Sequence, residues 1–176
     1  QIAITNGGGI RSNVPVGAET PADVTLAKPI AVTLGDVLTV FPFGNLVSTF
    51  KLTGADVVAA LENGVSLVEE GAGRFPQVSG IRYSWDGSKP AGSRIVSVEV
   101  VAEDGTATPI DPAATYTLVS NDFMRRGGDG YEVFATNAID PYDFGKPLDQ
   151  VLQEAIKAGS PIAPMVEGRI TRVDAQ

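Results

Sequence analysis

The stretch LVSTFKLTGADVVAALENGV, residues 46–65, contains a strand pattern followed directly by a helix pattern, and it decides the fold class. Apolar and polar residues alternate from Leu46 to Leu52, which predicts a half-buried strand. Thr53 then occupies the position of a helix N-cap. The apolar residues that follow keep helical spacing: Val57, Val58, Leu61 and Val65. A strand that leads into an amphipathic helix is expected where helices pack against sheets.

Outside this stretch the same two patterns recur in irregular order. Further strands are predicted over residues 2–5, 81–85, 95–101, 116–119 and 168–173, and further helices over residues 33–40 and 148–159. The pairs Asp86-Gly87 and Asp104-Gly105 are strong turn signals, and the polar residues 12–28 are expected to form a loop. This order predicts one α+β domain over residues 1–176, with mixed β-sheets covered by helices in layers.

The composition limits the classes of protein to which the chain can belong. Of the 176 residues, 43% are hydrophobic and 19% are charged, as in folded globular domains. The net charge of −8 argues against a general nucleic-acid binder, and no apolar run approaches the roughly 18 residues of a membrane span. The chain has no cysteine and no histidine, which excludes disulfides and thiolate zinc sites and argues against a hydrolytic metal centre here.

Residues 6–11, Asn-Gly-Gly-Gly-Ile-Arg, follow the first predicted strand. Glycines allow the backbone to approach a ligand closely and to present its N–H groups, and the Arg11 guanidinium matches the geometry of a phosphate. The candidate binding residues of this segment are Asn6, Gly8, Gly9 and Arg11. The alternative is a flexible turn followed by a surface arginine. The glycine spacing does not match a dinucleotide-binding fingerprint.

Residues 41–45, Phe-Pro-Phe-Gly-Asn, place two large aromatic side chains at a tight connection. An aromatic residue on a loop can stack on a nucleic base, which is worth about 1–3 kcal/mol. Phe43 is therefore a candidate stacking residue, and Asn45 is a polar candidate in the same loop. The alternative is that these phenylalanines fill the core.

Residues 121–130, Asn-Asp-Phe-Met-Arg-Arg-Gly-Gly-Asp-Gly, follow another predicted strand. Phe123 could stack on a base, and the Asp129 carboxylate could accept hydrogen bonds from paired sugar hydroxyls. The alternative is a hairpin loop whose turn is Asp129-Gly130. Arg125 or Arg126 is expected to add positive charge at the rim of such a site, unless both are ordinary solvated charges.

A fourth motif, Arg-Phe-Pro-Gln-Val-Ser-Gly-Ile-Arg at residues 74–82, is expected to be mainly structural, although Arg74 could reach an anion. In order, and over essentially the whole chain, the four motifs resemble the C-terminal, substrate-binding domain of the 5′-nucleotidase family. The resemblance implies that Phe43 and Phe123 sandwich the base, that Asp129 binds the ribose hydroxyls, and that Asn6 contacts the base or sugar. It also implies that Arg11 holds the phosphate.

The same resemblance implies which parts of the activity lie elsewhere. In that family an N-terminal metallophosphoesterase domain of the same polypeptide carries two divalent metal ions and the catalytic residues. This chain opens directly on a predicted strand, so we expect it to be a fragment that lacks the N-terminal domain. It would then contain no catalytic and no metal-binding residue, and alone it would be inactive.

The implied parent protein is a hydrolase that converts nucleoside 5′-phosphates, such as AMP, to nucleoside and phosphate. Because the family is mostly exported, a periplasmic or extracellular location is expected. Two alternatives stay open from the sequence. One is a related UDP-sugar, NAD or 2′,3′-cyclic nucleotide hydrolase, and the other is a stand-alone, non-catalytic module that binds adenosine or a nucleotide.

Overall fold

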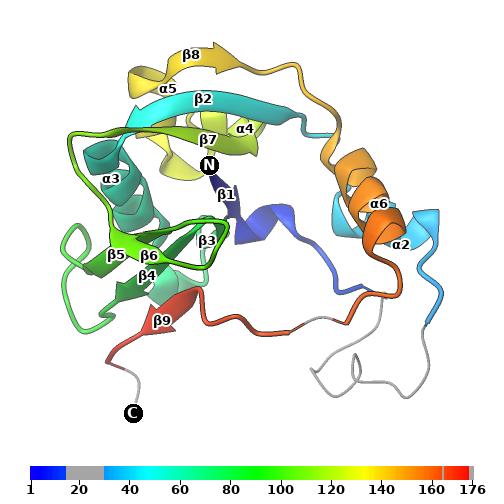
Figure 1. Cartoon of the computed structure of the whole chain (residues 1–176), viewed down its shortest axis with the longest axis horizontal. Helices are drawn as coiled ribbons and strands as arrows, with labels where there is room; N and C mark the ends of the chain where they lie inside the picture. Colours follow the sequence, from blue (N-terminus) through cyan, green and yellow to red (C-terminus); the bar gives the residue numbers. More distant parts are fainter. Residues whose placement is uncertain (15–29, 164, 175–176) are drawn as a thin grey trace.

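The computed structural model describes residues 1–14, 30–163 and 165–174 of the chain (Figure 1). Within these residues the strands are β1 (Ile2–Asn6), β2 (Val47–Thr53), β3 (Pro76–Ser79), β4 (Ile81–Trp85), β5 (Ile95–Val101), β6 (Ala107–Pro109), β7 (Thr115–Asn121), β8 (Ile139–Tyr142) and β9 (Ile170–Arg172). The α-helices are α2 (Leu34–Val40), α3 (Gly54–Gly64), α4 (Asp122–Arg125), α5 (Glu132–Asn137) and α6 (Leu148–Gly159), and the 3-10 helices are η1 (Gly7–Gly9), η2 (Val68–Glu70) and η3 (Gly128–Gly130).

The strands form two mixed sheets. One sheet has five strands in the order β3-β1-β7-β2-β8, and the other has four in the order β6-β5-β4-β9. β1 is parallel to β7 and β4 is parallel to β9, whereas the other pairs are antiparallel. The prediction of an α+β fold with mixed sheets and helices is therefore confirmed.

The strand and helix expected in residues 46–65 are present as β2 and α3. Every second residue of β2 is buried, namely Ser48, Phe50 and Leu52. The Thr53 hydroxyl accepts a hydrogen bond from the Asp56 N–H at 3.2 Å, so Thr53 caps α3 as predicted. The helix then buries one face against the sheets, through Val57, Ala60 and Leu61.

The core lies where α3 and α5 cover the five-stranded sheet and meet the inner face of the four-stranded sheet. At its centre Phe50 of β2 stands opposite Leu118 of β7, and the Phe50 ring meets the Phe134 ring edge-on with centroids 5.0 Å apart. The second sheet adds Ile81, Tyr83 and Trp85 to the same cluster. Both sheets therefore contribute to one hydrophobic core.

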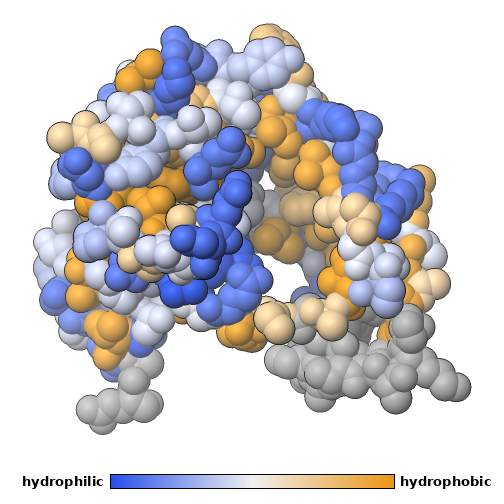
Figure 2. Space-filling model, viewed as in Figure 1, coloured by the Kyte–Doolittle hydropathy of each residue, from blue (hydrophilic) through white to orange (hydrophobic). Residues whose placement is uncertain are grey.

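α2 and α6 form a separate pair that packs together away from the second sheet, on one side of the molecule in Figure 1. Thr33 and Asp36 form the N-terminal capping box of α2, in agreement with the predicted helix start. α6 begins and ends as predicted, but none of its residues is fully buried. Figure 2 shows a hollow at the centre of this face, between the helix pair and the sheets.

Four segments meet at one end of the five-stranded sheet because of its strand directions. β1 and β7 are parallel, so the residues that follow them leave the sheet at the same end. β3 and β2 run antiparallel to these neighbours, so the residues that precede them arrive there. The four sequence motifs noted above thus supply adjoining loops: residues 7–11, 41–46, 74–75 and 122–130.

For the segment after β7, the alternative prediction of a hairpin loop is wrong. The segment folds as the one-turn helix α4, then η3, and leads into α5 rather than into a partner strand. By contrast, the turn at Asp104-Gly105 joins β5 to β6 as expected, with Gly105 at φ +85°. Most of the loop predicted over residues 12–28 lies outside the described residues.

Candidate binding site at one end of the five-stranded sheet

The Asp129 carboxylate is held by a hydrogen bond from the first strand. The Asn6 Nδ2 atom donates to Asp129 Oδ2 at 2.6 Å, and the Asn121 Nδ2 atom donates to Asn6 Oδ1 at 3.1 Å. Asn6 is only 4% exposed. Its amide therefore orients the Asp129 carboxylate, and the expected contact of Asn6 with the base or sugar stays a prediction.

The backbone at Asp129 adopts the left-handed conformation, with φ 55° and ψ 26°. Asp tolerates this region better than most residues, and the surrounding contacts hold it there. The Asn63 Nδ2 atom donates to the Asp129 carbonyl at 3.2 Å. Arg74 in turn donates to Asn63 Oδ1 at 3.2 Å and to Ser66 Oγ at 3.1 Å. Arg74 thus supports the Asp129 turn, and the expectation that it reaches an anion finds no support.

The glycine loop packs against a neighbouring loop. The N–H groups of Gly7 and Gly8 donate to the carbonyls of Phe75 and Gly73, each at 2.7 Å. A Cβ added at Gly8 would lie 2.8 Å from the Gly73 Cα atom, so only glycine allows this approach. The expectation that these two N–H groups face a ligand is therefore wrong, because the protein backbone already uses them. Gly9 is buried beside Asn6.

Arg11 lies at the surface, next to one of the two candidate stacking residues. Its Cζ atom is 5.9 Å from the centroid of the Phe43 ring, and its Nη1 atom donates to the Gly8 carbonyl at 3.2 Å. That is the only hydrogen bond from the guanidinium to the part of the chain that the structure describes. The planar group therefore keeps donors for an anionic ligand.

Phe43 and Phe123 are both exposed, at 59% and 44% of their surface. The alternative that the phenylalanines of residues 41–45 fill the core is therefore wrong for Phe43, whereas Phe41 is half-buried. The Phe123 ring lies over Gly128, where an added Cβ would come within 2.6 Å of three ring atoms. Each ring therefore has exposed surface that a planar ligand could contact.

The two phenylalanines belong to segments that are hydrogen-bonded to each other. The Leu46 N–H donates to Asp122 Oδ1 at 2.9 Å, and the Asp122 N–H donates to the Leu46 carbonyl at 2.9 Å. Asn121 caps α4 by accepting a hydrogen bond from the Met124 N–H at 2.8 Å.

A small cavity of about 10 Å³ lies beside the loop of Phe43. It is lined by Gly9, Phe41, Phe43, Gly44, Asn45, Leu148 and Asp149.

The two consecutive arginines of α4 and its C-cap have different environments. Arg125 is 16% exposed and donates hydrogen bonds to the Asp143 carboxylate from Nε and Nη2. Arg126 is 58% exposed, and its Nη1 atom lies 3.4 Å from Asp122 Oδ2. The hydrogen bonds from Arg125 lower the pKa of the Asp143 carboxyl below its ordinary value. Arg125 therefore carries no free charge to the rim of the site, and only Arg126 is exposed enough for that role.

Neither a metal centre nor a membrane-spanning helix is found in the part of the chain that the structure describes. No group of three or more His, Cys, Asp or Glu side chains in these residues is arranged to hold a metal ion. No helix among them is both long enough and apolar enough to cross a bilayer.

Comparison with known proteins agrees with the fold and with the motifs. Residues 1–136 match the family described as 5′-nucleotidase, C-terminal domain, and the chain belongs to this family. The trifunctional nucleotide phosphoesterase protein YfkN of Bacillus subtilis (strain 168) is 40% identical over 174 residues, which are 98% of this chain and 11% of that protein. The snake venom 5′-nucleotidase of Macrovipera lebetinus is 32% identical over 176 residues, with 98% of this chain and 41% of that protein covered.

Two solved structures show the same architecture. The 5′-nucleotidase precursor from Thermus thermophilus superposes with a TM-score of 0.88 at 43% identity, covering 100% of this chain and 32% of that one. The NAD nucleotidase NadN of Haemophilus influenzae superposes with a TM-score of 0.78 at 29% identity, covering 97% of this chain and 30% of that one. This chain thus spans between 11% and 41% of the length of these four relatives.

Proposed function

We propose that this chain is the nucleotide-recognition domain of a metal-dependent 5′-nucleotidase, which hydrolyses nucleoside 5′-phosphates to nucleoside and phosphate. The observation that carries the proposal is that two exposed aromatic rings and an oriented carboxylate lie on adjoining loops at one end of the five-stranded sheet. Phe43 and Phe123 arrive on adjoining segments, and Asp129 is fixed between β1 and α3 by Asn6 and Asn63.

Each group has a defined part in recognition. Phe43 and Phe123, called the base clamp below, would stack on the two faces of the base, with about 1–3 kcal/mol from each stacked ring. The Asp129 carboxylate would accept hydrogen bonds from the ribose hydroxyls, and Asn6 would act through Asp129. Arg11 would bind the phosphate, while Gly8, Gly9 and Asn45 would shape the wall near the clamp.

Hydrolysis itself is assigned to an N-terminal catalytic domain of the same polypeptide, with two divalent metal ions. The side chains described in this structure offer no set of ligands for such ions, so no catalytic step is assigned to this chain. Relatives whose names include snake venom 5′-nucleotidase support a periplasmic or extracellular protein.

A related substrate is the second candidate. The similarity to the NAD nucleotidase of Haemophilus influenzae favours a parent that acts on a dinucleotide, and the 40% identity to a trifunctional nucleotide phosphoesterase favours a broad range. The base clamp suits each of these substrates because stacking tolerates different bases. The same relationship would accommodate a UDP-sugar or 2′,3′-cyclic nucleotide hydrolase.

Titration of adenosine and AMP into the chain tests the proposal. Phe43→Ala and Phe123→Ala should each weaken binding of both ligands by about tenfold, because each removes one stacking contact. Val96→Ala, which truncates an exposed apolar side chain of β5 in the other sheet, is the control and should bind like the wild type. Equal affinities in all four proteins would defeat the proposal.

A further inference from the structure

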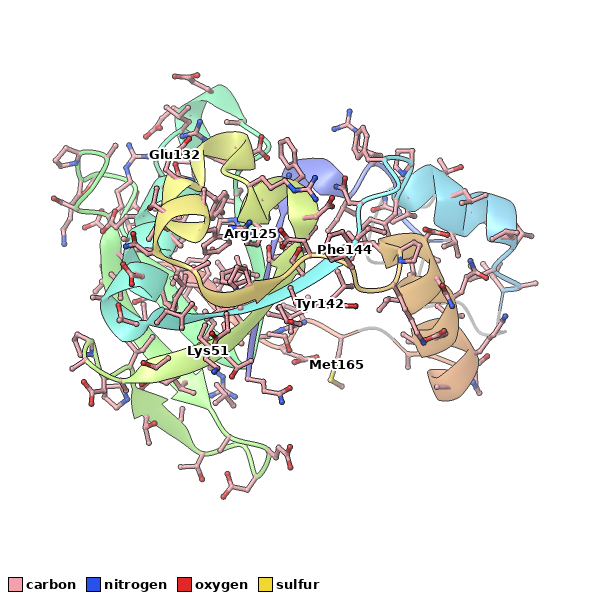
Figure 3. All side chains as sticks on the ribbon, turned by 90° about the horizontal axis from the view of Figure 1, so that it is seen from above. Lys51, Arg125, Glu132, Tyr142, Phe144 and Met165 are labelled. Atoms are coloured by element: carbon pink, nitrogen blue, oxygen red, sulfur yellow. The ribbon has the colours of Figure 1, made fainter. Side chains whose placement is uncertain are left out.

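The segment from Asp143 to Asp149 contacts both of the elements that carry the base clamp. On one side Asp143 is paired with Arg125 of α4, the helix of Phe123. On the other side the Leu148 N–H donates to the Asn45 carbonyl at 2.9 Å, two residues from Phe43. In Figure 3 this segment passes Arg125 and continues through Phe144 toward α6. It therefore links the two halves of the clamp.

The contact between Arg125 and Asp143 has the geometry of a strong ion pair. Arg125 Nε lies 3.0 Å from Asp143 Oδ1, and Arg125 Nη2 lies 3.0 Å from Asp143 Oδ2. The remaining guanidinium nitrogen, Nη1, donates to the carbonyl of Phe134 in α5 at 3.2 Å. The two side chains are only 16% and 14% exposed, so solvent screens this pair less than an ordinary surface pair.

The helix that carries Phe123 depends on such anchors. α4 contains four residues, Asp122–Arg125, and a single turn is too short to be stable by its own hydrogen bonds. Met124 is fully buried and fixes one side of the turn, and Arg125 fixes the side that faces the 143–149 segment. Phe123 lies next to Met124 in the chain, and its ring is 44% exposed on one side and lies over Gly128 on the other.

We propose that Arg125 and Asp143 form a positioning pair that sets the orientation of the Phe123 ring in the base clamp, an inference that rests on the proposed function. The pair touches no ligand. It holds α4 against the 143–149 segment, and backbone hydrogen bonds join that segment to residues 45–47. The segment thus constrains the spacing of Phe43 and Phe123 without contacting the ligand.

A double-mutant cycle with adenosine tests this inference. Adenosine is uncharged at neutral pH, so the loss of an arginine does not act on it by long-range attraction. Arg125→Met should weaken adenosine binding by roughly three- to tenfold in the wild-type background, the coupling typical of residues in one network. In the Phe123→Ala background the same substitution should have no effect. Equal weakening in both backgrounds would overturn the proposal.

A second readout follows the ring without any ligand. The wild type should show a nuclear Overhauser effect between the Phe123 ring protons and the Gly128 Hα protons, since the ring lies over Gly128. The signal should be weaker in Arg125→Met and partly restored in Arg125→Lys, which keeps the charge and loses the two-pronged contact. Arg82→Met, which removes an exposed arginine from β4, is the matched control. An unchanged signal in Arg125→Met would contradict the proposal.

The outcomes separate this inference from the proposed function. If Phe123→Ala leaves adenosine binding unchanged, the base clamp itself is wrong. If Phe123→Ala weakens binding and Arg125→Met does not, only the positioning pair is wrong. Asp143→Asn weakens the same pair from the other side without changing the sequence of α4, so it replaces Arg125→Met if that variant does not fold, with the same expected results.

Discussion

Asp129 shows how a single residue can be prepared for binding before any ligand arrives. Its backbone is held in the left-handed region, and one carboxylate oxygen already accepts a hydrogen bond from Asn6. Asn63 fixes its carbonyl from α3. A carboxylate that is oriented in this way loses little freedom on binding, and such preorganisation favours affinity.

Asp129→Asn tests the assigned ribose contact. Asparagine also tolerates the left-handed region and keeps an oxygen for Asn6, so the fold should be retained. Hydrogen bonds to a charged group are worth about 1.5–3 kcal/mol, so adenosine should bind at least tenfold more weakly. The variant should also lose the preference for adenosine over 2′-deoxyadenosine, measured by parallel titrations. A preference as large as that of the wild type would contradict the assignment.

Gly8→Ala tests the close approach of the two loops. The new Cβ would lie 2.8 Å from the Gly73 Cα atom, and backbone must move to relieve the clash. The free energy of unfolding should fall by about 1–3 kcal/mol, as for other overpacked sites. Gly35→Ala in α2 is the control: its Cβ would lie in ordinary contact with Thr33 Oγ1, at 3.6 Å, so denaturant unfolding should show equal or higher stability.

The sequence predicts Asn6, Phe43, Phe123 and Asp129 as binding residues, a prediction that the proposed experiments test, but it does not predict the residues that support them. Asn63 supports Asp129 from 66 positions away in the chain, and nothing local to either residue marks that contact. Asn121 had a visible signal, because an asparagine that precedes a helix is a common N-cap. The role of Asn6 could not be predicted, since its partner Asp129 lies 123 positions away.

Among the elements, the one-turn helix α4 is the least self-sufficient and the closest to the proposed site. Its position depends on the cap at Asn121, on the buried Met124 and on the pairing of Arg125 with Asp143. Stability measurements on this pair report directly on how α4 is anchored.

Asp143→Asn should destabilise the fold in a pH-dependent way. Arg125 lowers the folded-state pKa of Asp143 by hydrogen bonding and Arg126 adds a weaker favourable charge, while partial burial acts in the opposite direction. The pair therefore stabilises the fold above the unfolded-state pKa of about 3.9, and this contribution is lost as pH falls through the lowered folded-state pKa.

The free energy of unfolding, measured in urea, should drop by about 2 kcal/mol at pH 7 in Asp143→Asn. The difference from the wild type should shrink as the pH is lowered below about 4. A difference that stays constant between pH 7 and pH 3 would show that the ion pair is not its cause.

The long elements were all predictable, whereas the short ones were predicted only in part: β1 and β4 were expected, but β3, α4, α5 and β8 were not. α3 and α6 carry eleven and twelve residues with clear periodicity, and the capping residue of α3 is Thr53 as expected. β3, α4, α5 and β8 contain only four to six residues each. Elements this short form because tertiary contacts hold them, so local propensity gives little signal.

At the scale of the whole molecule, the proposed site is a product of sheet topology. Four segments that are widely separated in the chain meet because β1 and β7 are parallel and β2 and β3 oppose them. The sequence contains the four motifs but not the strand order β3-β1-β7-β2-β8, so their convergence followed from the resemblance and not from the residues themselves.

The assignment of hydrolysis to another domain makes a prediction for the isolated chain. Incubation with AMP and Mg²⁺, Mn²⁺ or Zn²⁺ should release no phosphate above the level of the buffer, because the chain has no histidine or cysteine and its described residues form no cluster of metal ligands. Phosphate release that depends on the metal and scales with the concentration of the chain would overturn this division of roles.

The most direct test of the central claim is an experimental structure of the chain with adenosine bound. We predict that the adenine ring lies between the Phe43 and Phe123 rings, with the ribose hydroxyls within hydrogen-bond distance of the Asp129 carboxylate. Adenosine bound at another place, or in this place with neither ring stacked on the base, would contradict the account.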